Sequence, residues 1–373
     1  MFKEVEKYLV KGYDFTKDVV KNRILFKKKK ETEFKILREI DLNSIYRELQ
    51  HKGKSISFAN LKKLLESDFV PEVNAIKDYF SKLPAWDNKT DYISQLAKTV
   101  STHDDALFEK ALRKWIVATL ACAINDKDIN HTALILVGPQ GCGKTTWLLK
   151  LIPMDLHDYV TSSQIKPGDK DSMLRLCDNI LINMDEMASY SNTQIEFYKE
   201  LITKDKVSER RAYAQFSENY IRRASFVGST NNSKILVDTT GNRRFLVFEV
   251  KNIDYLHQVD LDMVYAQAKA LLDSGFQHWF DNTEIQLLEK NNANFRQLST
   301  EEEYLDMYFR KPSVSETNSV EYMNASEIIA YIKKESSVPV LLNNVALGKV
   351  LRAKGFSEKK ISGAKKYSVI RLK

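Results

Sequence analysis

Eight residues near the middle of the chain have the types and the spacing that hold the phosphates of a nucleotide. The run Gly-Pro-Gln-Gly-Cys-Gly-Lys-Thr, residues 138–145, matches the pattern G-x-x-x-x-G-K-[ST]. In such a loop the backbone N–H groups turn towards the phosphates, the lysine reaches the β and γ oxygens, and the hydroxyl binds Mg²⁺. We therefore predict ATP and Mg²⁺ as cofactors, with Lys144 as the phosphate clamp and Thr145 as a magnesium ligand. The predicted nucleotide contacts are Gly138, Pro139, Gln140, Gly141, Cys142, Gly143, Lys144, Thr145 and Thr146.

The residues around this loop indicate the elements that must position it. An apolar run at 133–137 precedes the loop and a helical run at 146–150 follows it, which puts the start of a helix at the phosphates. Further short apolar runs lie at 180–184, 224–228 and 245–248. Strands that alternate with helices are typical of a parallel sheet covered by helices. Ligands of such sheets bind at the carboxyl ends of the strands.

Two acids stand at one such strand end. Asp185 and Glu186 follow the apolar run at 180–184 directly. We interpret Asp185 as a magnesium ligand acting through water and Glu186 as the group that orients or deprotonates the attacking water. The alternative is a solvated strand end. A nucleotide kinase rarely needs the second acid, so the pair favours a hydrolase.

An amide and two arginines complete the set. Asn231 closes the third predicted strand, where an amide can hydrogen-bond the γ-phosphate or the attacking water. Arg243 and Arg244 come just before the fourth, and an arginine beside a transferring phosphate stabilises its charge. The alternatives are a turn asparagine and an ordinary pair of surface arginines. We predict catalytic roles for all three.

In this order and spacing, the motifs resemble the virulence-associated protein E family. That family is similar to superfamily 3 AAA+ helicases and to the helicase halves of phage and plasmid primase-helicases. The segment Leu83-Pro84-Ala85-Trp86-Asp87 also resembles the family's Leu-Pro-x-Trp-Asp signature. The other residues that carry the resemblance are 138–145, Asp185-Glu186, 226–231 and 240–245.

The resemblance implies a ring, usually a hexamer of identical chains, that hydrolyses ATP to move along or open DNA in the replication of a phage, plasmid or genomic island. It assigns Lys144 and Thr145 to the phosphate loop, Asp185 and Glu186 to the metal and water, and Asn231 to sensing the nucleotide. It makes Arg243 or Arg244 the residue that acts on a neighbouring subunit's ATP. The sequence has no acidic or zinc pattern for primer synthesis, so we expect a separate primase as partner.

Basic residues also fall in the interval that faces the central pore of superfamily 3 motors. The segments 204–213 and 220–223 are rich in Lys, Arg and Tyr. Lysine and arginine follow phosphates and a tyrosine stacks on a base, which suits single-stranded DNA. The alternative is a basic surface hairpin. The predicted DNA contacts are Lys206, Arg210, Arg211 and Tyr213.

The net charge of +7 lies entirely in the C-terminal tail, where residues 320–373 hold 11 Lys and Arg against 4 Glu. Predicted helices at 325–334 and 345–356 and a basic hairpin at 359–370 are typical of a winged helix, which docks on double-stranded DNA. A module for protein contacts is the alternative. The predicted DNA contacts are Lys349, Arg352, Lys359, Lys360, Lys365 and Lys366.

We therefore expect an α/β fold with a P-loop NTPase core of the AAA+ type. The expected parts are a mainly helical domain with a short strand pair (1–83), the ATPase domain (84–310) with a helical collar (84–130), a polar linker (311–319) and the winged-helix-like module (320–373). The chain has no apolar run of membrane-spanning length, and its first residues are too charged for the apolar core of a secretory signal peptide. Its three cysteines are far apart in the sequence, which fits a reducing compartment. A cytoplasmic protein without a membrane partner is the expectation.

Three functions fit these observations. The first is an ATP-dependent DNA helicase or translocase. The second is a DNA-binding replication initiator or loader that uses ATP as an assembly switch. The third is a P-loop kinase acting on a small molecule, which would be a monomer indifferent to DNA.

Overall fold

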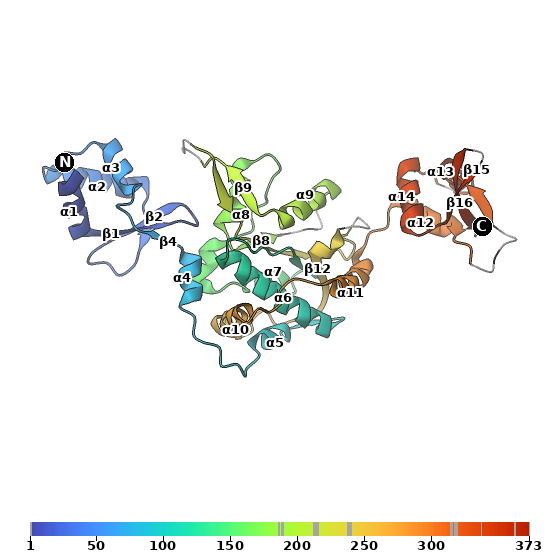
Figure 1. Ribbon diagram of the computed structural model, residues 1–373, viewed down its shortest axis with the longest axis horizontal. Helices are drawn as coiled ribbons and strands as arrows, with labels where there is room; N and C mark the ends of the chain where they lie inside the picture. Colours follow the sequence, from blue (N-terminus) through green and yellow to red (C-terminus); the bar gives the residue numbers. More distant parts are fainter. Residues whose placement is uncertain are drawn as a thin grey trace. The chain divides into compact units, whose positions relative to one another are not determined.

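The computed structural model describes residues 2–185, 187, 190–211, 216–236, 241–313, 316, 320–336, 338–361 and 363–372. The chain divides into two compact units (Figure 1). The first comprises Met1–Asn232 and Arg243–Leu288, and the second comprises Ser233–Asn242 and Glu289–Lys373. This division does not test the domain borders predicted after residues 83 and 310, which stay predictions.

A six-stranded sheet forms the centre of the first unit. Its order is β5-β12-β6-β11-β8-β7. The strands are β5 (Val100–Thr102), β6 (Ala133–Val137), β7 (Val160–Thr161), β8 (Leu181–Met184), β11 (Ser225–Thr230) and β12 (Phe245–Ile253). All neighbours pair in parallel except β5, which is antiparallel to β12. The mixed α/β architecture with a parallel sheet and the four predicted strands are thus confirmed.

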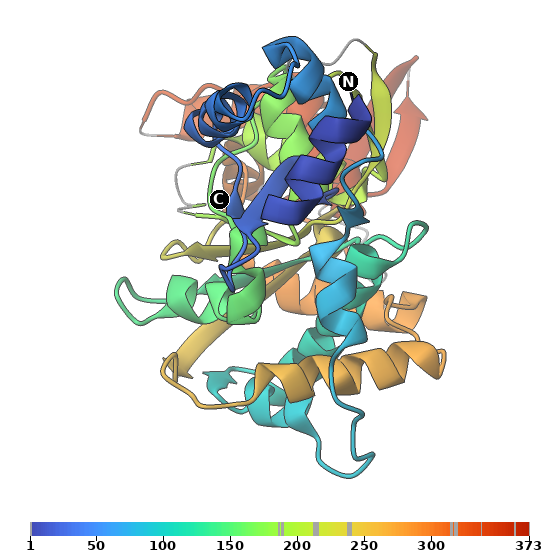
Figure 2. The ribbon, with the colours of Figure 1, turned by 90° about the vertical axis from the view of Figure 1, so that its left-hand side faces the viewer.

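Helices cover this sheet because its inner strands are apolar on both faces. Every residue of β6 is buried, as expected of a strand enclosed by layers on either side. Helix α6 (Asp105–Ile124) is itself buried around most of its circumference, with Trp115 and Leu120 fully buried. Helices α5 (Tyr92–Ala97) and α10 (Leu261–Asp273) pack on α6 and lie side by side in both ribbon views (Figures 1 and 2).

The remaining elements of the first unit lie around this core. They are α4 (Ala75–Ser81), α7 (Lys144–Leu149), η1 (Met154–Tyr159), α8 (Lys170–Asp178), α9 (Asn192–Thr203), β9 (Lys206–Glu209), β10 (Glu218–Ile221) and η3 (Asn242–Arg244). Strands β9 and β10 pair as an antiparallel hairpin. Helix α11 (Asn282–Asn292) spans the point at which the chain passes from the first unit into the second.

The N-terminal residues build a sheet of their own with a separate apolar core. The helices are α1 (Phe2–Gly12), α2 (Glu39–His51) and α3 (Phe58–Leu65), and the strands are β1 (Tyr13–Asp18), β2 (Arg23–Lys28), β3 (Lys35–Ile36) and β4 (Glu72–Val73). The sheet order is β3-β2-β1-β4. The sequence predicted one short strand pair in this region without residue bounds. Strands β3 and β4 have two residues each and are too short to leave a periodic pattern.

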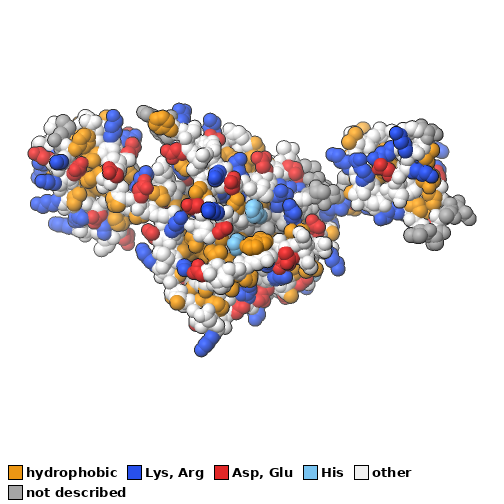
Figure 3. Space-filling model, in the orientation of Figure 1, with side chains coloured by type: hydrophobic (Ala, Val, Ile, Leu, Met, Phe, Trp, Pro, Cys, Tyr) orange, Lys and Arg blue, Asp and Glu red, His pale blue; other side chains and the backbone are white. Residues whose placement is uncertain are grey.

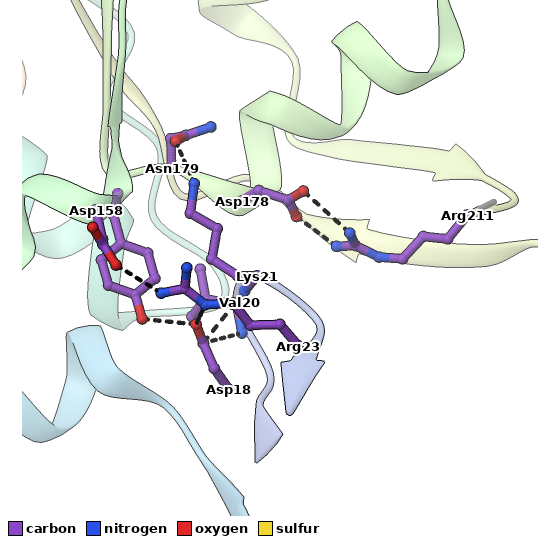
Figure 4. A network of polar contacts seen from close by, with 9 residues as sticks. Asp18, Val20, Lys21, Arg23, Asp158, Asp178, Asn179 and Arg211 are labelled. Atoms are coloured by element: carbon purple, nitrogen blue, oxygen red, sulfur yellow. Dashed lines mark hydrogen bonds and ion pairs between the residues drawn. The ribbon is translucent and has the colours of Figure 1, made fainter. Parts of the chain in front are cut away.

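A polar network at the β1–β2 turn joins this N-terminal sheet to the central one (Figure 4). The carboxylate of Asp18 is fully buried and accepts hydrogen bonds from Nε of Arg23 at 3.2 Å and from the hydroxyl of Tyr159 at 2.8 Å. Burial and the Asp18 carboxylate raise the pKa of Tyr159, which therefore stays a donor. Lys21 donates to Oδ1 of Asn179 at 2.8 Å. The turn is thereby fixed to the residues next to β7 and β8.

The second unit ends in a small module of helices and a basic hairpin. Its elements are η4 (Ala293–Phe295), α12 (Thr300–Tyr308), β13 (Phe309–Arg310), β14 (Glu321–Met323), α13 (Ala325–Glu335), α14 (Asn344–Ala353), β15 (Glu358–Ile361) and β16 (Ala364–Arg371). Helices α13 and α14 match the two predicted helices. Helix α14 ends before Gly355, whose φ of +73° is a conformation that favours glycine.

Among the described residues, the helices are all too short or too polar to cross a lipid bilayer.

Candidate functional site

The glycine-rich loop, residues 138–143, connects the end of β6 to the start of α7. Its first N–H, that of Gly138, donates to the carbonyl of Thr230 at 3.1 Å, so the loop starts from a fixed point at the end of β11. Gly141 and Gly143 have φ values of +79° and +90°. These left-handed conformations explain why glycine occupies both positions.

The lysine of the motif points into this loop. Lys144 is the first residue of α7 and is buried. Its Nζ donates to the carbonyl of Gly138 at 2.8 Å and to that of Pro139 at 2.6 Å, and it lies 3.7 Å from Sγ of Cys142. The hydroxyl of Thr145 is 2.9 Å from that of Ser229. The positive charge is therefore held in the curve of the loop, and the threonine hydroxyl faces the end of β11.

A cleft of about 600 Å³ opens over the loop. It brings together the carboxyl ends of β6, β8 and β11, because Val137 pairs with Thr230 and Gly228 pairs with Met184. Of the predicted site residues, the cleft is lined by Gln140, Gly141, Gly143, Lys144, Thr145, Thr146, Asp185 and Asn231. Ser229, Thr230 and Tyr255 also line it, and their sequence positions predicted no role for them. Glu186 lies outside the described residues.

Oxygen atoms dominate the possible metal ligands in this cleft. Thr145 offers a hydroxyl and Asp185 an exposed carboxylate, which are donors of the hard type that Mg²⁺ prefers. Nowhere in the described part of the chain do three or more His, Cys, Asp or Glu side chains gather as a metal site. The donor set thus suits a magnesium ion that is bound jointly with phosphate oxygens.

The predicted arginines lie at the opposite edge of the sheet. Arg243 is exposed and Arg244 half-buried, in the η3 turn that leads into β12. Phe245 pairs with Ala133, the first residue of β6, whereas the loop follows its last residue. Since a strand rises about 3.3 Å per residue, the length of β6 separates the two edges by about 16 Å. The arginines and the glycine-rich loop of one chain therefore do not share a site.

A second cavity, of about 550 Å³, lies beside these arginines. Arg243, Arg244, His131 and Trp279 are among the residues that line it. Partial burial, followed by repulsion from the guanidinium groups of Arg222 and Arg244, lowers the pKa of His131. The lining of the cavity holds Lys127, Arg243 and Arg244 against one carboxylate, that of Asp128, so positive charge predominates there and suits an anionic group.

The predicted DNA contacts in the middle of the chain differ in their availability. Lys206 and Arg210 are exposed at the β9–β10 hairpin. Arg211 pairs with both carboxylate oxygens of Asp178, at 3.1 and 2.5 Å (Figure 4). Its guanidinium also covers the ring of Tyr220. Burial lowers the pKa of Arg211, but the Asp178 carboxylate raises it by more, so the pKa lies above its usual value. Its guanidinium is thus committed to an internal ion pair. Tyr213 lies outside the described residues.

Arg222 corrects one expectation. The family resemblance placed it with the basic residues that face the central pore, but it is fully buried. Its guanidinium donates to the carbonyls of Leu201 at 3.0 Å and Ile202 at 2.6 Å, in the last turn of α9, and to that of Asn130 at 2.9 Å. Burial lowers the pKa of Arg222. It ties the hairpin to α9 and to the residues before β6, a role that sequence spacing does not reveal.

The predicted contacts in the C-terminal module lie on α14 and on the β15–β16 hairpin. Lys and Arg side chains stand on the face of this module seen in Figure 3. Lys349, Arg352, Lys359, Lys360 and Lys365 are exposed, and Lys366 is half-buried. Lys359 pairs across the strands with Lys366, and Lys360 with Lys365. The charge of Lys365 is partly compensated by an ion pair with Glu358 at 2.6 Å, and that of Lys366 by an ion pair with Glu327 at 3.1 Å.

A known protein family matches most of the central region of the chain. A family profile described as a virulence-associated protein E-like domain matches residues 80–297. The chain belongs to this family. No curated protein matched it. The match includes the glycine-rich loop, the cleft and both arginines, which confirms the resemblance drawn from their motifs.

The fold of this family member resembles that of one solved structure, the NrS-1 C-terminal region. The apo structure of the NrS-1 C-terminal region (305–718) superposes with a TM-score of 0.51 at 14% identity, over 98% of each chain. The A-form apo structure of the same region has a TM-score of 0.49 at 15% identity, again over 98% of each chain. A structure of JCV helicase with a bound small molecule has a TM-score of 0.29 over 72% of each chain at 13% identity.

The buried position of Arg222 makes it a sensitive site for stability. Arg222→Met keeps most of the apolar stem but removes every donor, so the carbonyls of α9 and Asn130 lose their partner. We expect a loss of at least ~3 kcal/mol in the free energy of unfolding, measured by urea titration. Arg210→Met, at an exposed position nearby, should change it by less than about 0.5 kcal/mol. Equal unfolding midpoints for the two variants would show that Arg222 is not the anchor.

Proposed function

We propose that this protein is an ATP-driven DNA motor, a helicase or translocase that acts in the replication of a phage, plasmid or genomic island. One observation carries the proposal. A glycine-rich loop, a lysine, a hydroxyl, a carboxylate and an amide meet in one cleft at the ends of three neighbouring parallel strands. Phosphoryl transfer needs such positioning and charge stabilisation and little covalent chemistry from the protein.

In this proposal the core is a P-loop NTPase of the AAA+ type. It is supported by the position of β11 between β6 and β8, which sets an additional strand between the loop and the acidic pair. With phosphates in the loop, the amide of Asn231 would lie between them and Asp185, where it can sense the presence of the γ-phosphate. A small-molecule kinase gains nothing from a sensor at this position or from a water-orienting acid.

The residues of the cleft have separate tasks when ATP binds. Lys144 exchanges the carbonyls of Gly138 and Pro139 for β- and γ-phosphate oxygens, and the loop N–H groups bind the remaining oxygens. Thr145 and Asp185 would hold Mg²⁺, which neutralises charge that develops on the phosphates. Glu186, which lies outside the described residues, would orient or deprotonate the attacking water.

The arginines extend the site to a neighbouring copy of the chain. Because Arg243 and Arg244 lie at the other edge of the sheet from their own loop, they can serve a phosphate only on another subunit. The electropositive cavity next to them supports this assignment. A closed ring, which we propose to be a homo-hexamer, supplies every loop with an arginine from its neighbour.

DNA contacts are proposed on two surfaces. Lys206 and Arg210, with Tyr213, would hold single-stranded DNA at the hairpin, while Arg211 supports the hairpin through Asp178. The C-terminal module would act as a winged helix on double-stranded DNA, with Lys349 and Arg352 on its second helix. The opposed lysines of β15 and β16 support this role, because Glu358 and Glu327 compensate these like-charged cross-strand pairs only in part, and DNA phosphates would complete the compensation. A separate primase would supply primers.

The arginine assignment makes hydrolysis a property of the assembled ring. Arg243→Ala or Arg244→Ala should keep nucleotide affinity and lose turnover by about a thousandfold, since only transition-state charge loses its partner. Mixing that variant with Lys144→Ala should restore part of the activity, because an intact arginine then serves an intact loop. ATP turnover and the mass of the mixed assemblies are the measurements.

The matched control is a chain that carries both substitutions, mixed with the arginine variant alone. No intact arginine is then present, and activity should stay absent. Mixed rings that remain inactive in the first experiment, or a monomer that hydrolyses ATP at the full rate, would contradict the trans-acting role.

The opposed lysines predict opposite effects on DNA affinity and on stability. Lys359→Ala combined with Lys360→Ala should weaken binding to duplex DNA and reduce the slope of log affinity against log salt by about 2, because two phosphate contacts are lost. The same variant should unfold at an equal or higher urea concentration, because cross-strand repulsion is relieved.

The control is Lys333→Ala combined with Lys334→Ala, which removes the same charge from the exposed end of α13. An equal loss of affinity in this variant would mean that net charge alone matters. Unchanged affinity in both variants would make the module a site of protein contacts.

A further inference from the structure

An aromatic ring lies directly on the glycine-rich loop. Tyr255 stands in the segment that follows β12 and lines the cleft over the loop. A Cβ atom placed on Gly143 would come within 2.2 Å of Cδ1 of the Tyr255 ring and within 2.6 Å of Cγ. The ring therefore takes the space that any side chain at position 143 would need. Glycine is required there by the tyrosine as well as by its φ of +90°.

The backbone on both sides of Tyr255 is fixed to the core. The N–H of Asp254 donates to the carbonyl of Thr99 at 2.7 Å. Nζ of Lys150, just after α7, donates to the carbonyl of His257 at 2.5 Å, and the His257 side chain is buried. The first anchor holds the turn to the residue before β5, and the second holds it to the residue after α7. The position of the tyrosine is thus determined by the fold.

The cleft otherwise lacks a surface suited to a nucleobase. Its remaining lining consists of glycines, hydroxyls, amides, one lysine and one carboxylate, which suit phosphates and a metal ion. Among the described residues that line it, Tyr255 is the one with an aromatic side chain, and 38% of it is exposed. An exposed ring with a fixed position is a stacking platform, because it presents a flat face at a small cost in conformational entropy.

We propose that Tyr255 stacks on the base of the bound nucleotide and is the principal contact to the part of the ligand beyond the phosphates. This inference rests on the proposed function, since it takes the phosphates to lie in the glycine-rich loop. Recognition through the face of a base needs the ring and not the hydroxyl. It also accepts any base, with purines held more tightly than pyrimidines because their stacking area is larger.

The test compares a ligand that has a base with one that has none. Dissociation constants of ATP and of inorganic tripolyphosphate, each with Mg²⁺, are measured by calorimetry for the full chain and its variants. Tyr255→Ala should weaken ATP binding by about 5- to 150-fold, the value of one stacked base, and leave tripolyphosphate binding unchanged. Tyr255→Phe should bind both ligands as the unaltered protein does.

Leu256→Ala is the matched control, because Leu256 is the next residue, is 67% exposed and does not line the cleft. It should change neither constant. If Tyr255→Ala weakens both ligands equally, the ring supports the loop and does not contact the base. If it weakens neither, the stacking contact does not exist. An unaltered protein that binds neither ligand would overturn the proposed function itself, which separates that failure from a failure of the stacking proposal.

Discussion

The parallel pairing of β6, β11 and β8 is the constraint on which the rest of the structure depends. These strands are buried on both faces, and their register places the loop, Asn231 and Asp185 at one edge. Packing keeps the strands close, since a Cβ atom on Gly228 would lie 3.1 Å from the carbonyl of Met184 and 2.6 Å from Sδ of Met187. A shift of one residue would move the polar groups away from the cleft and reverse the side chains of the strand.

The same register separates the arginines from the loop. Because β12 runs parallel to β6, residues that precede β12 must lie at the edge away from the cleft over the glycine-rich loop. A hydrolase that uses them needs a second copy of the chain. The segment that follows β12 returns to the loop instead, and it carries Tyr255. One strand thus leads from the proposed trans-acting arginines at its start to the proposed base contact after its end.

The sequence predicted the features that depend on neighbouring residues. The glycine-rich loop and the strands at its edge follow from short apolar runs that end in characteristic polar groups, and the family profile confirms the family that those motifs indicated. The roles of the individual site residues and the DNA contacts stay predictions. The short strands β3 and β4 were missed because two residues carry no periodicity.

Two residues show why the remainder depends on tertiary structure. The family resemblance placed Arg222 with the basic residues that face the central pore, whereas its partners are carbonyls contributed by distant segments. Tyr255 was missed because its contact with Gly143 joins two segments far apart in the chain. A positive φ at a motif glycine was predictable, but the ring above it was not.

ATP hydrolysis, measured with and without single-stranded DNA beside the oligomeric mass, tests the central claim most directly. We predict that the unaltered protein hydrolyses ATP as an oligomer, that DNA raises the rate, and that Lys144→Ala abolishes turnover in both conditions because the clamp on the phosphate oxygens is removed. Turnover by a monomer that is indifferent to DNA, or full activity in Lys144→Ala, would contradict the account.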